Sequence, residues 1–93
     1  MIVEGKRIKK VAAIKYDAAE DAPKLIAKGA GAVADKILEK AEENNIPTYH
    51  DEKLAETLTK LELGDFIPPE LYQVVAEIMV FVTDLDKLYD KVK

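Results

Sequence analysis

The chain has 93 residues, a formal net charge of −4 and 48% hydrophobic residues, a balance typical of a folded domain rather than a disordered segment. It contains no cysteine, which excludes disulfides and thiolate chemistry. No apolar run approaches the roughly 20 residues needed to cross a bilayer, and no signal peptide is recognisable. We therefore expect one domain spanning residues 1–93 that works in the cytoplasm.

Basic residues gather near the N-terminus. Residues 1–15 contain five of them against Glu4, a local balance of +4, so the remaining residues carry −8. The acidic total argues against general nucleic-acid binding. Two interpretations of the basic cluster stay open: a solvated edge strand that lysine protects from aggregation, or a surface that steers a protein partner.

The hydrophobic pattern predicts six elements. In chain order these are strands over 8–16 and 24–28, a helix over 32–44, a strand over 46–50, and helices over 52–61 and 69–89. Residues 1–10 are interpreted as a basic lead that runs into the first strand, and residues 84–93 as a frayed C-terminal end. Helices alternating with short buried strands indicate an α/β fold, a small sandwich of a three- to four-stranded sheet with three to four helices packed around it.

Local sequence signals mark one end of each of the three predicted helices. Asn44-Asn45 ends the first helix, because asparagine tolerates the left-handed conformation that a helix C-terminus often needs. Asp51 is expected to cap the second helix through its carboxylate. Pro69 suits the first turn of the last helix, where its missing N–H is not needed.

One motif suggests a cofactor. Gly29-x-Gly31-x-x-Ala34 fits a loose dinucleotide fingerprint, follows a strand, opens a helix and has Asp51 about 20 residues onward. A sharp strand-to-helix turn needs glycine in any case, and the chain is too short for two mononucleotide-binding halves. A small nucleotide-binding protein is kept as the alternative function, and the leading prediction includes no cofactor.

Catalytic residue types are scarce. The chain has no serine, one arginine and one histidine, His50, which is interpreted as an exposed loop residue rather than a metal ligand. We predict that the protein is not an enzyme and holds no metal. The apolar segment Phe66-Ile67-Pro68-Pro69 is a candidate partner-binding surface, with Lys10 of the basic cluster as a further candidate.

Three stretches carry a family resemblance. They are Val11-Ala12-Ala13-Ile14-Lys15-Tyr16-Asp17, then Asp21-Ala22-Pro23-Lys24-Leu25-Ile26-Ala27-Lys28-Gly29-Ala30, and finally Leu63-Gly64-Asp65-Phe66-Ile67-Pro68-Pro69-Glu70-Leu71 with the helix that follows. Read in order, they resemble the cytoplasmic C-terminal domain of the FlhB/YscU family over residues 11–82. The resemblance implies a domain of a flagellar or other type III protein export apparatus that contacts export substrates and apparatus components.

The family's self-cleavage motif is absent. The resemblance implies cleavage within Asn-Pro-Thr-His, where the asparagine amide attacks its own carbonyl. Counting back without gaps from Val11 places Lys6, Arg7, Ile8 and Lys9 at these four positions. The only asparagines precede Asn45 and Ile46, so the chain contains no Asn-Pro bond.

These observations predict a soluble, non-catalytic FlhB-like interaction domain without the family's membrane domain. Its expected partners are protein components or substrates of a flagellar or related type III export apparatus, with no nucleic acid and no direct membrane insertion. We expect a cytoplasmic protein that the apparatus recruits to the inner face of the membrane. The identity of the partner, a role beside or in place of a full-length FlhB, the type of export system and the oligomeric state stay open.

Overall fold

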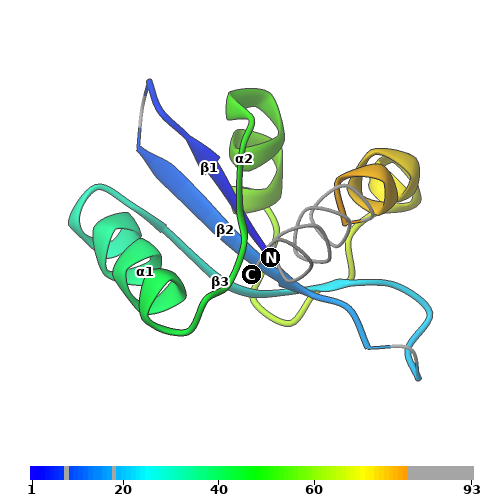
Figure 1. Ribbon diagram of the computed structural model, residues 1–93. Helices are drawn as coiled ribbons and strands as arrows, with labels where there is room; N and C mark the ends of the chain where they lie inside the picture. Colours follow the sequence, from blue (N-terminus) through cyan, green and yellow to red (C-terminus); the bar gives the residue numbers. More distant parts are fainter. Residues whose placement is uncertain (8, 18, 80–93) are drawn as a thin grey trace.

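The computed structural model describes residues 1–7, 9–17 and 19–79 (Figure 1). Its strands form one mixed sheet in the order β3-β2-β1-β4. The strands are β1 (Ile2–Gly5), β2 (Lys10–Lys15), β3 (Lys24–Ala30) and β4 (Thr48–His50). β2 is antiparallel to both β1 and β3, whereas β1 and β4 are parallel. The predicted α/β fold with a three- to four-stranded sheet is confirmed.

The position of β1 differs from the sequence-based expectation. Residues 1–10 were expected to form only a basic lead and a strand start, but Ile2–Gly5 is an interior strand that pairs with β2 on one side and β4 on the other. Ile2 and Val3 are buried on opposite faces of the sheet. A four-residue strand with two large apolar residues has too little pattern to be recognised alone. Of the basic residues that follow, Lys6, Arg7 and Lys9 lie in the connection to β2, and Lys10 and Lys15 are the two ends of β2. They do not form an edge strand, because β2 is interior and the edges of the sheet are β3 and β4.

The helix α1 (Ala32–Glu43) covers one face of the sheet, and α2 (Glu52–Thr59) together with helical residues 72–79 covers the other (Figure 1). The helix α1 packs its Ala34 and Ala41 against Ile2, Val11 and Ala13. The larger core lies on the other face under α2, with residues from the last part of the chain. Its buried members are Val3, Ala12, Ile14, Leu25, Leu54, Ala55, Leu58, Ile67, Val75 and Ile78.

The predicted end of the first helix and start of the second are confirmed, whereas α2 ends at Thr59, two residues before the predicted end at residue 61. Asn45 adopts a left-handed conformation with φ of 56° immediately after α1. The Asp51 carboxylate accepts a hydrogen bond of 3.0 Å from the Leu54 N–H at the start of α2. Pro69 is the first residue of a short 3₁₀ turn, η1 (Pro69–Leu71), which leads into helical residues 72–79. The remainder of the predicted last helix and the expected frayed end, 84–93, lie outside the described residues.

Within the described part of the chain, no helix combines the length and apolar character required to span a bilayer.

Candidate functional site: the sheet end and two surface pockets

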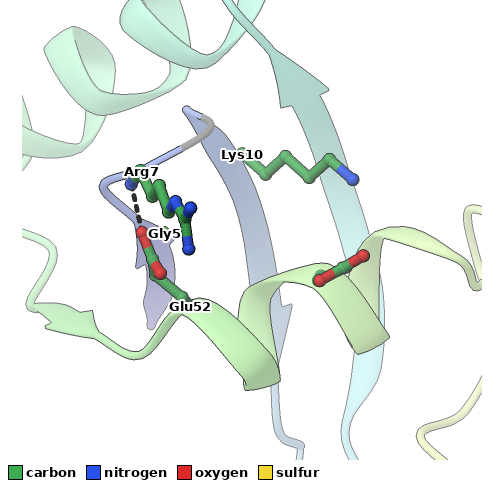
Figure 2. Close-up of a pocket in the computed structure, with 5 residues that line it drawn as sticks. Gly5, Arg7, Lys10 and Glu52 are labelled. Atoms are coloured by element: carbon green, nitrogen blue, oxygen red, sulfur yellow. Dashed lines mark hydrogen bonds between the residues drawn. The ribbon is translucent and has the colours of Figure 1, made fainter.

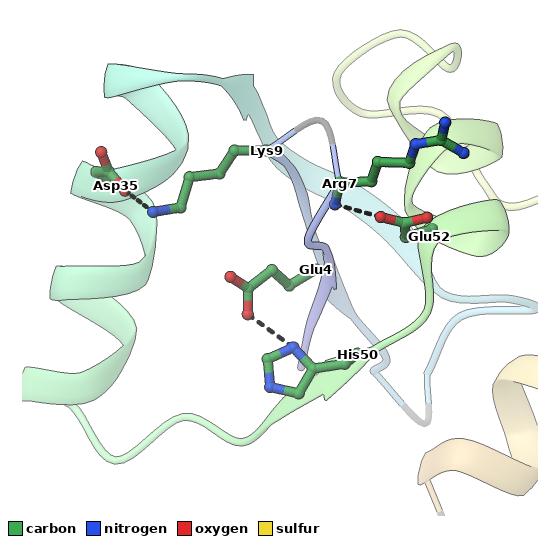
Figure 3. A network of polar contacts seen from close by, with 6 residues as sticks. All are labelled: Glu4, Arg7, Lys9, Asp35, His50 and Glu52. Atoms are coloured by element: carbon green, nitrogen blue, oxygen red, sulfur yellow. Dashed lines mark hydrogen bonds and ion pairs between the residues drawn. The ribbon is translucent and has the colours of Figure 1, made fainter.

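The β1–β2 connection contains the positions predicted to replace the cleavage motif. Lys6, Arg7 and Lys9 lie between the end of β1 and the start of β2, and Ile8 lies outside the described residues. The connection contacts both helices (Figure 3). The Arg7 N–H donates a hydrogen bond to the Glu52 carboxylate at the start of α2. On the other face, the Lys9 ammonium forms an ion pair with Asp35 of α1. These two contacts join the connection to α1 and α2 on opposite faces of the sheet.

Lys9 also binds α1 through its backbone. Its carbonyl accepts a hydrogen bond of 3.0 Å from the Gly31 N–H. The hydrogen bond and charge attraction from Asp35, with a weaker attraction from Glu4, raise the pKa of the exposed Lys9 ammonium above its ordinary value. The cation therefore stays charged throughout the physiological range, and the side chain and backbone of one residue both hold the connection to α1.

The glycine motif serves this turn. Gly31 has φ of 57°, a conformation that favours glycine, and its N–H is already bonded to Lys9. A Cβ on Gly29 would lie 2.5 Å from Cγ1 of Val33, so Gly29 is required for the close approach of β3 and α1. Ala34 is fully buried against the sheet. Because the Gly31 amide and the space beside Gly29 are both used internally, the geometry gives no support to a phosphate site at this helix start.

His50 pairs with a neighbouring strand. It lies at the end of β4, about half exposed, with its Nδ1 2.9 Å from Oε2 of Glu4 on β1 (Figure 3). The adjacent Asp51 is used as the cap of α2. Among residues 1–7, 9–17 and 19–79, no cluster of three or more potential metal ligands is present.

Only part of the candidate binding surface at Phe66-Ile67-Pro68-Pro69 is exposed to solvent. Phe66 is 48% exposed, and the Lys24 ammonium lies 5.2 Å from its ring centroid. Ile67 is 1% exposed, and its N–H donates a hydrogen bond of 2.9 Å to the Pro23 carbonyl. The inclusion of Ile67 as a contact residue was therefore wrong, because its side chain fills the core. Pro68 is half-buried and Pro69 is exposed.

An apolar pocket of about 250 Å³ lies on the same side of the molecule and was missed in the sequence. Its lining joins the β2–β3 connection to helical residues 72–79 and consists of Tyr16, Asp21, Ala22, Pro23, Tyr72, Ala76 and Met79. Tyr16 and Tyr72 are 52% and 43% exposed. Tyr16 and Tyr72 are 56 positions apart in the sequence, so nothing in the sequence indicated that they lie at one site. Only the packing of the last helical segment against Ala22 and Pro23 brings them together.

A second pocket of about 280 Å³ lies between the β1–β2 connection and α2. Gly5, Arg7, Lys10, Glu52 and Glu56 line it. Figure 2 shows Arg7 on the β1–β2 connection, Lys10 at the start of β2 and Glu52 on α2. Lys10, a predicted partner-binding residue, thus lies in a pocket with charges of both signs. We call this the charged pocket and the other the apolar pocket.

The fold is a small α/β domain, and its described residues line the charged pocket and the apolar pocket. The FlhB HrpN YscU SpaS family matches residues 10–82. The chain belongs to this family, and the resemblance inferred from its three stretches is confirmed.

Relatives of two lengths are similar to the chain. The Bacillus subtilis protein YlqH is 42% identical over 81 residues, which cover 86% of this chain and 87% of YlqH. The flagellar biosynthetic protein FlhB of Escherichia coli is 44% identical over 77 residues, 81% of this chain. The chain spans only 20% of that FlhB.

Solved structures show the same fold. The cytoplasmic domain of FlhB from Shewanella putrefaciens aligns with a TM-score of 0.87 and 31% identity, covering 96% of this chain and 74% of that one. The C-terminal domain of EscU carrying a proline-to-alanine substitution aligns with a TM-score of 0.81 and 28% identity, covering 87% and 81% of the two chains.

Proposed function

We propose that the chain is a non-catalytic interaction domain that binds protein components or substrates of a flagellar or related type III export apparatus. The observation that carries the proposal is its similarity, over 96% of its length, to the cytoplasmic domain of an FlhB. The chain aligns with that domain with a TM-score of 0.87, and its described residues line the charged pocket and the apolar pocket. By this proposal the protein acts on the cytoplasmic side of the membrane, where the apparatus recruits it.

The absence of catalysis is part of the proposal. The family reaction requires an Asn-Pro bond, and this chain has none. The corresponding segment at residues 6–9 is lysine- and arginine-rich and is bonded to α1 and α2. An uncleaved β1–β2 connection that is bonded to both helices supports a role in binding without self-cleavage.

The apolar pocket and its surroundings are the proposed contact surface. Tyr16 and Tyr72 offer large, partly exposed rings beside the small side chains of Ala22 and Ala76. Aromatic residues at the rim of such a depression commonly anchor protein contacts. The exposed Phe66 and Pro69 extend the apolar surface nearby, since Ile67 is bonded to Pro23 in the pocket wall. The occupant would be a protein segment that inserts an apolar side chain.

A binding experiment with purified cytoplasmic export components tests the proposal. Each component is immobilised, and binding is compared between this chain and an FlhB cytoplasmic domain as the positive control. We expect at least one component that binds FlhB to bind this chain also. Binding to none of them under conditions where the FlhB domain binds would refute the proposed function.

A pair of variants tests the contact surface. Ala76→Arg places a long charged side chain in the apolar pocket and should abolish most of the binding. Ala32→Arg makes the same change at an exposed position at the start of α1 and serves as the matched control. Equal binding by both variants would place the contact elsewhere on the domain.

A further inference from the structure

The end of the sheet is a fixed surface. The Arg7 backbone is bonded to Glu52, and the Lys9 side chain and carbonyl are bonded to Asp35 and Gly31. These contacts come from both helices, so the connection is bonded to α1 and to α2 independently. The Arg7 backbone is thereby placed beside the first turn of α2.

Some charged side chains in this region form ion pairs and others do not. Asp35 neutralises Lys9, whereas the Glu52 carboxylate bonds to the Arg7 N–H and not to its guanidinium. Within the described residues, no ion pair joins Arg7 or Lys10 to Glu52 or Glu56, although all four line the charged pocket. Two cations therefore face two carboxylates across a space of about 280 Å³.

We propose that the charged pocket binds a protein segment that presents one carboxylate and one ammonium group close together. The carboxylate would lie against Arg7 and Lys10 of the hairpin, and the ammonium against Glu56 of α2. A purely acidic or purely basic segment would meet one favourable wall and one repulsive wall, whereas a segment with both signs complements each wall. The proposal rests on the proposed function in taking a protein as the occupant, and it assigns a second contact distinct from the apolar pocket.

The test uses short peptides as probes with the full chain. Amide chemical shifts are followed during titration with a glycine-rich pentapeptide that is acetylated at its N-terminus, amidated at its C-terminus and carries one aspartate and one lysine. Matched peptides carry two aspartates, two lysines or neither. We expect saturable shifts at Gly5, Arg7, Lys10 and Glu56 that are largest with the mixed peptide and decrease as salt is added. Strongest binding of the two-aspartate or the two-lysine peptide would overturn the two-sign assignment, as would shifts spread evenly over the surface.

Charge reversals locate the site. Lys10→Glu and Glu56→Lys should each weaken the mixed peptide by about fivefold, the effect of one exposed ion pair at the upper end of its usual range. Lys36→Glu and Glu39→Lys make the same changes on exposed positions of α1 and should leave binding unchanged. Equal effects from the two sets of variants would refute a localised site.

The outcomes are independent of the export-component experiment. A chain that binds export components but not the mixed peptide loses only the charged-pocket proposal. A chain that binds the peptide but no export component keeps the pocket and loses the proposed function.

Discussion

The carboxylate of Glu52 accepts a hydrogen bond from the backbone N–H of Arg7, which lies 45 residues earlier in the chain. This contact joins the first turn of α2 to the segment that corresponds, by gapless counting, to the cleavage motif of the FlhB family. The chain has no Asn-Pro bond at this segment, so the family's cleavage reaction cannot break it. The uncleaved segment can therefore form a hydrogen bond to α2. This contact leads to predictions about chain integrity and about the stability of the connection.

The purified protein should remain a single chain of 10.3 kDa on prolonged incubation. The physical reason is that no asparagine side chain is placed to attack its own carbonyl ahead of a proline. Intact-mass spectrometry checks this, with an FlhB cytoplasmic domain incubated in parallel as a cleaving control. Two fragments separated near residue 7 would contradict the prediction.

Glu52→Ala should loosen the β1–β2 connection while leaving the fold intact. The loss of one exposed charge-assisted hydrogen bond should lower the free energy of unfolding by about 0.5–1 kcal/mol. Hydrogen exchange at the Arg7 amide should accelerate more than exchange at Val11 in β2. Glu56→Ala changes the same residue type one turn later and should leave the Arg7 amide protected, because that amide is bonded to Glu52 and not to Glu56. Unchanged Arg7 exchange in Glu52→Ala would show that the contact is absent in solution.

Asp35→Asn should lower the pKa of Lys9 towards its ordinary value of 10.5. Folding raises this pKa, so the pair's contribution to stability is present below the unfolded value and is lost as pH rises through the raised one. An alkaline titration of the Lys9 side chain by NMR measures the pKa directly. Glu39→Gln, an exposed carboxylate elsewhere on α1, is the control and should leave the Lys9 titration unchanged.

Leu58→Ala should lower the free energy of unfolding by about 2–5 kcal/mol, because Leu58 is fully buried on the core-facing side of α2 and its truncation leaves a cavity. Leu63→Ala, at a side chain that is 61% exposed, should change it by less than about 0.5 kcal/mol. Urea denaturation of both variants measures the difference. Similar effects of the two substitutions would mean that Leu58 does not belong to the core.

Gly29→Ala should destabilise the fold by about 1–3 kcal/mol, since the added methyl group would lie 2.5 Å from Cγ1 of Val33. Val33 is 54% exposed, so truncating it to alanine removes the shortest contact at little cost to the core and leaves the Val33 Cβ at 3.0 Å from the added methyl group. In the Val33→Ala background the same glycine substitution should therefore cost less. Urea denaturation of the four proteins forms a double-mutant cycle, and additive effects would contradict a direct clash.

Several features of the fold follow from local sequence. Asp51 caps α2, and Asn45 follows α1 in a left-handed conformation. Both effects depend on the residue type and on neighbours within a few positions in the chain. The need for glycine at Gly31 follows in the same way. The family resemblance, too, was readable along the chain, because it is carried by contiguous stretches.

Other features required the tertiary structure. The interior position of β1 depends on β2 and β4, which pair with a strand too short to have a pattern of its own. Burial of Ile67 depends on its bond to Pro23, so an apolar loop residue that suggested a surface became part of the core. Both pockets join segments more than 40 positions apart, and no local signal records such a contact.

The sequence by itself determined the family, the α/β class, the end of α1, the start of α2 and the absence of an Asn-Pro bond. The tertiary structure decided which residues are available for contact: Tyr16 with Tyr72 around the apolar pocket, and Arg7 and Lys10 opposite Glu52 and Glu56 around the charged one. The physical reason is the separation along the chain over which each kind of interaction acts. Caps, turns and bond chemistry act between near neighbours in the chain, whereas a pocket exists only after distant segments have packed against one another.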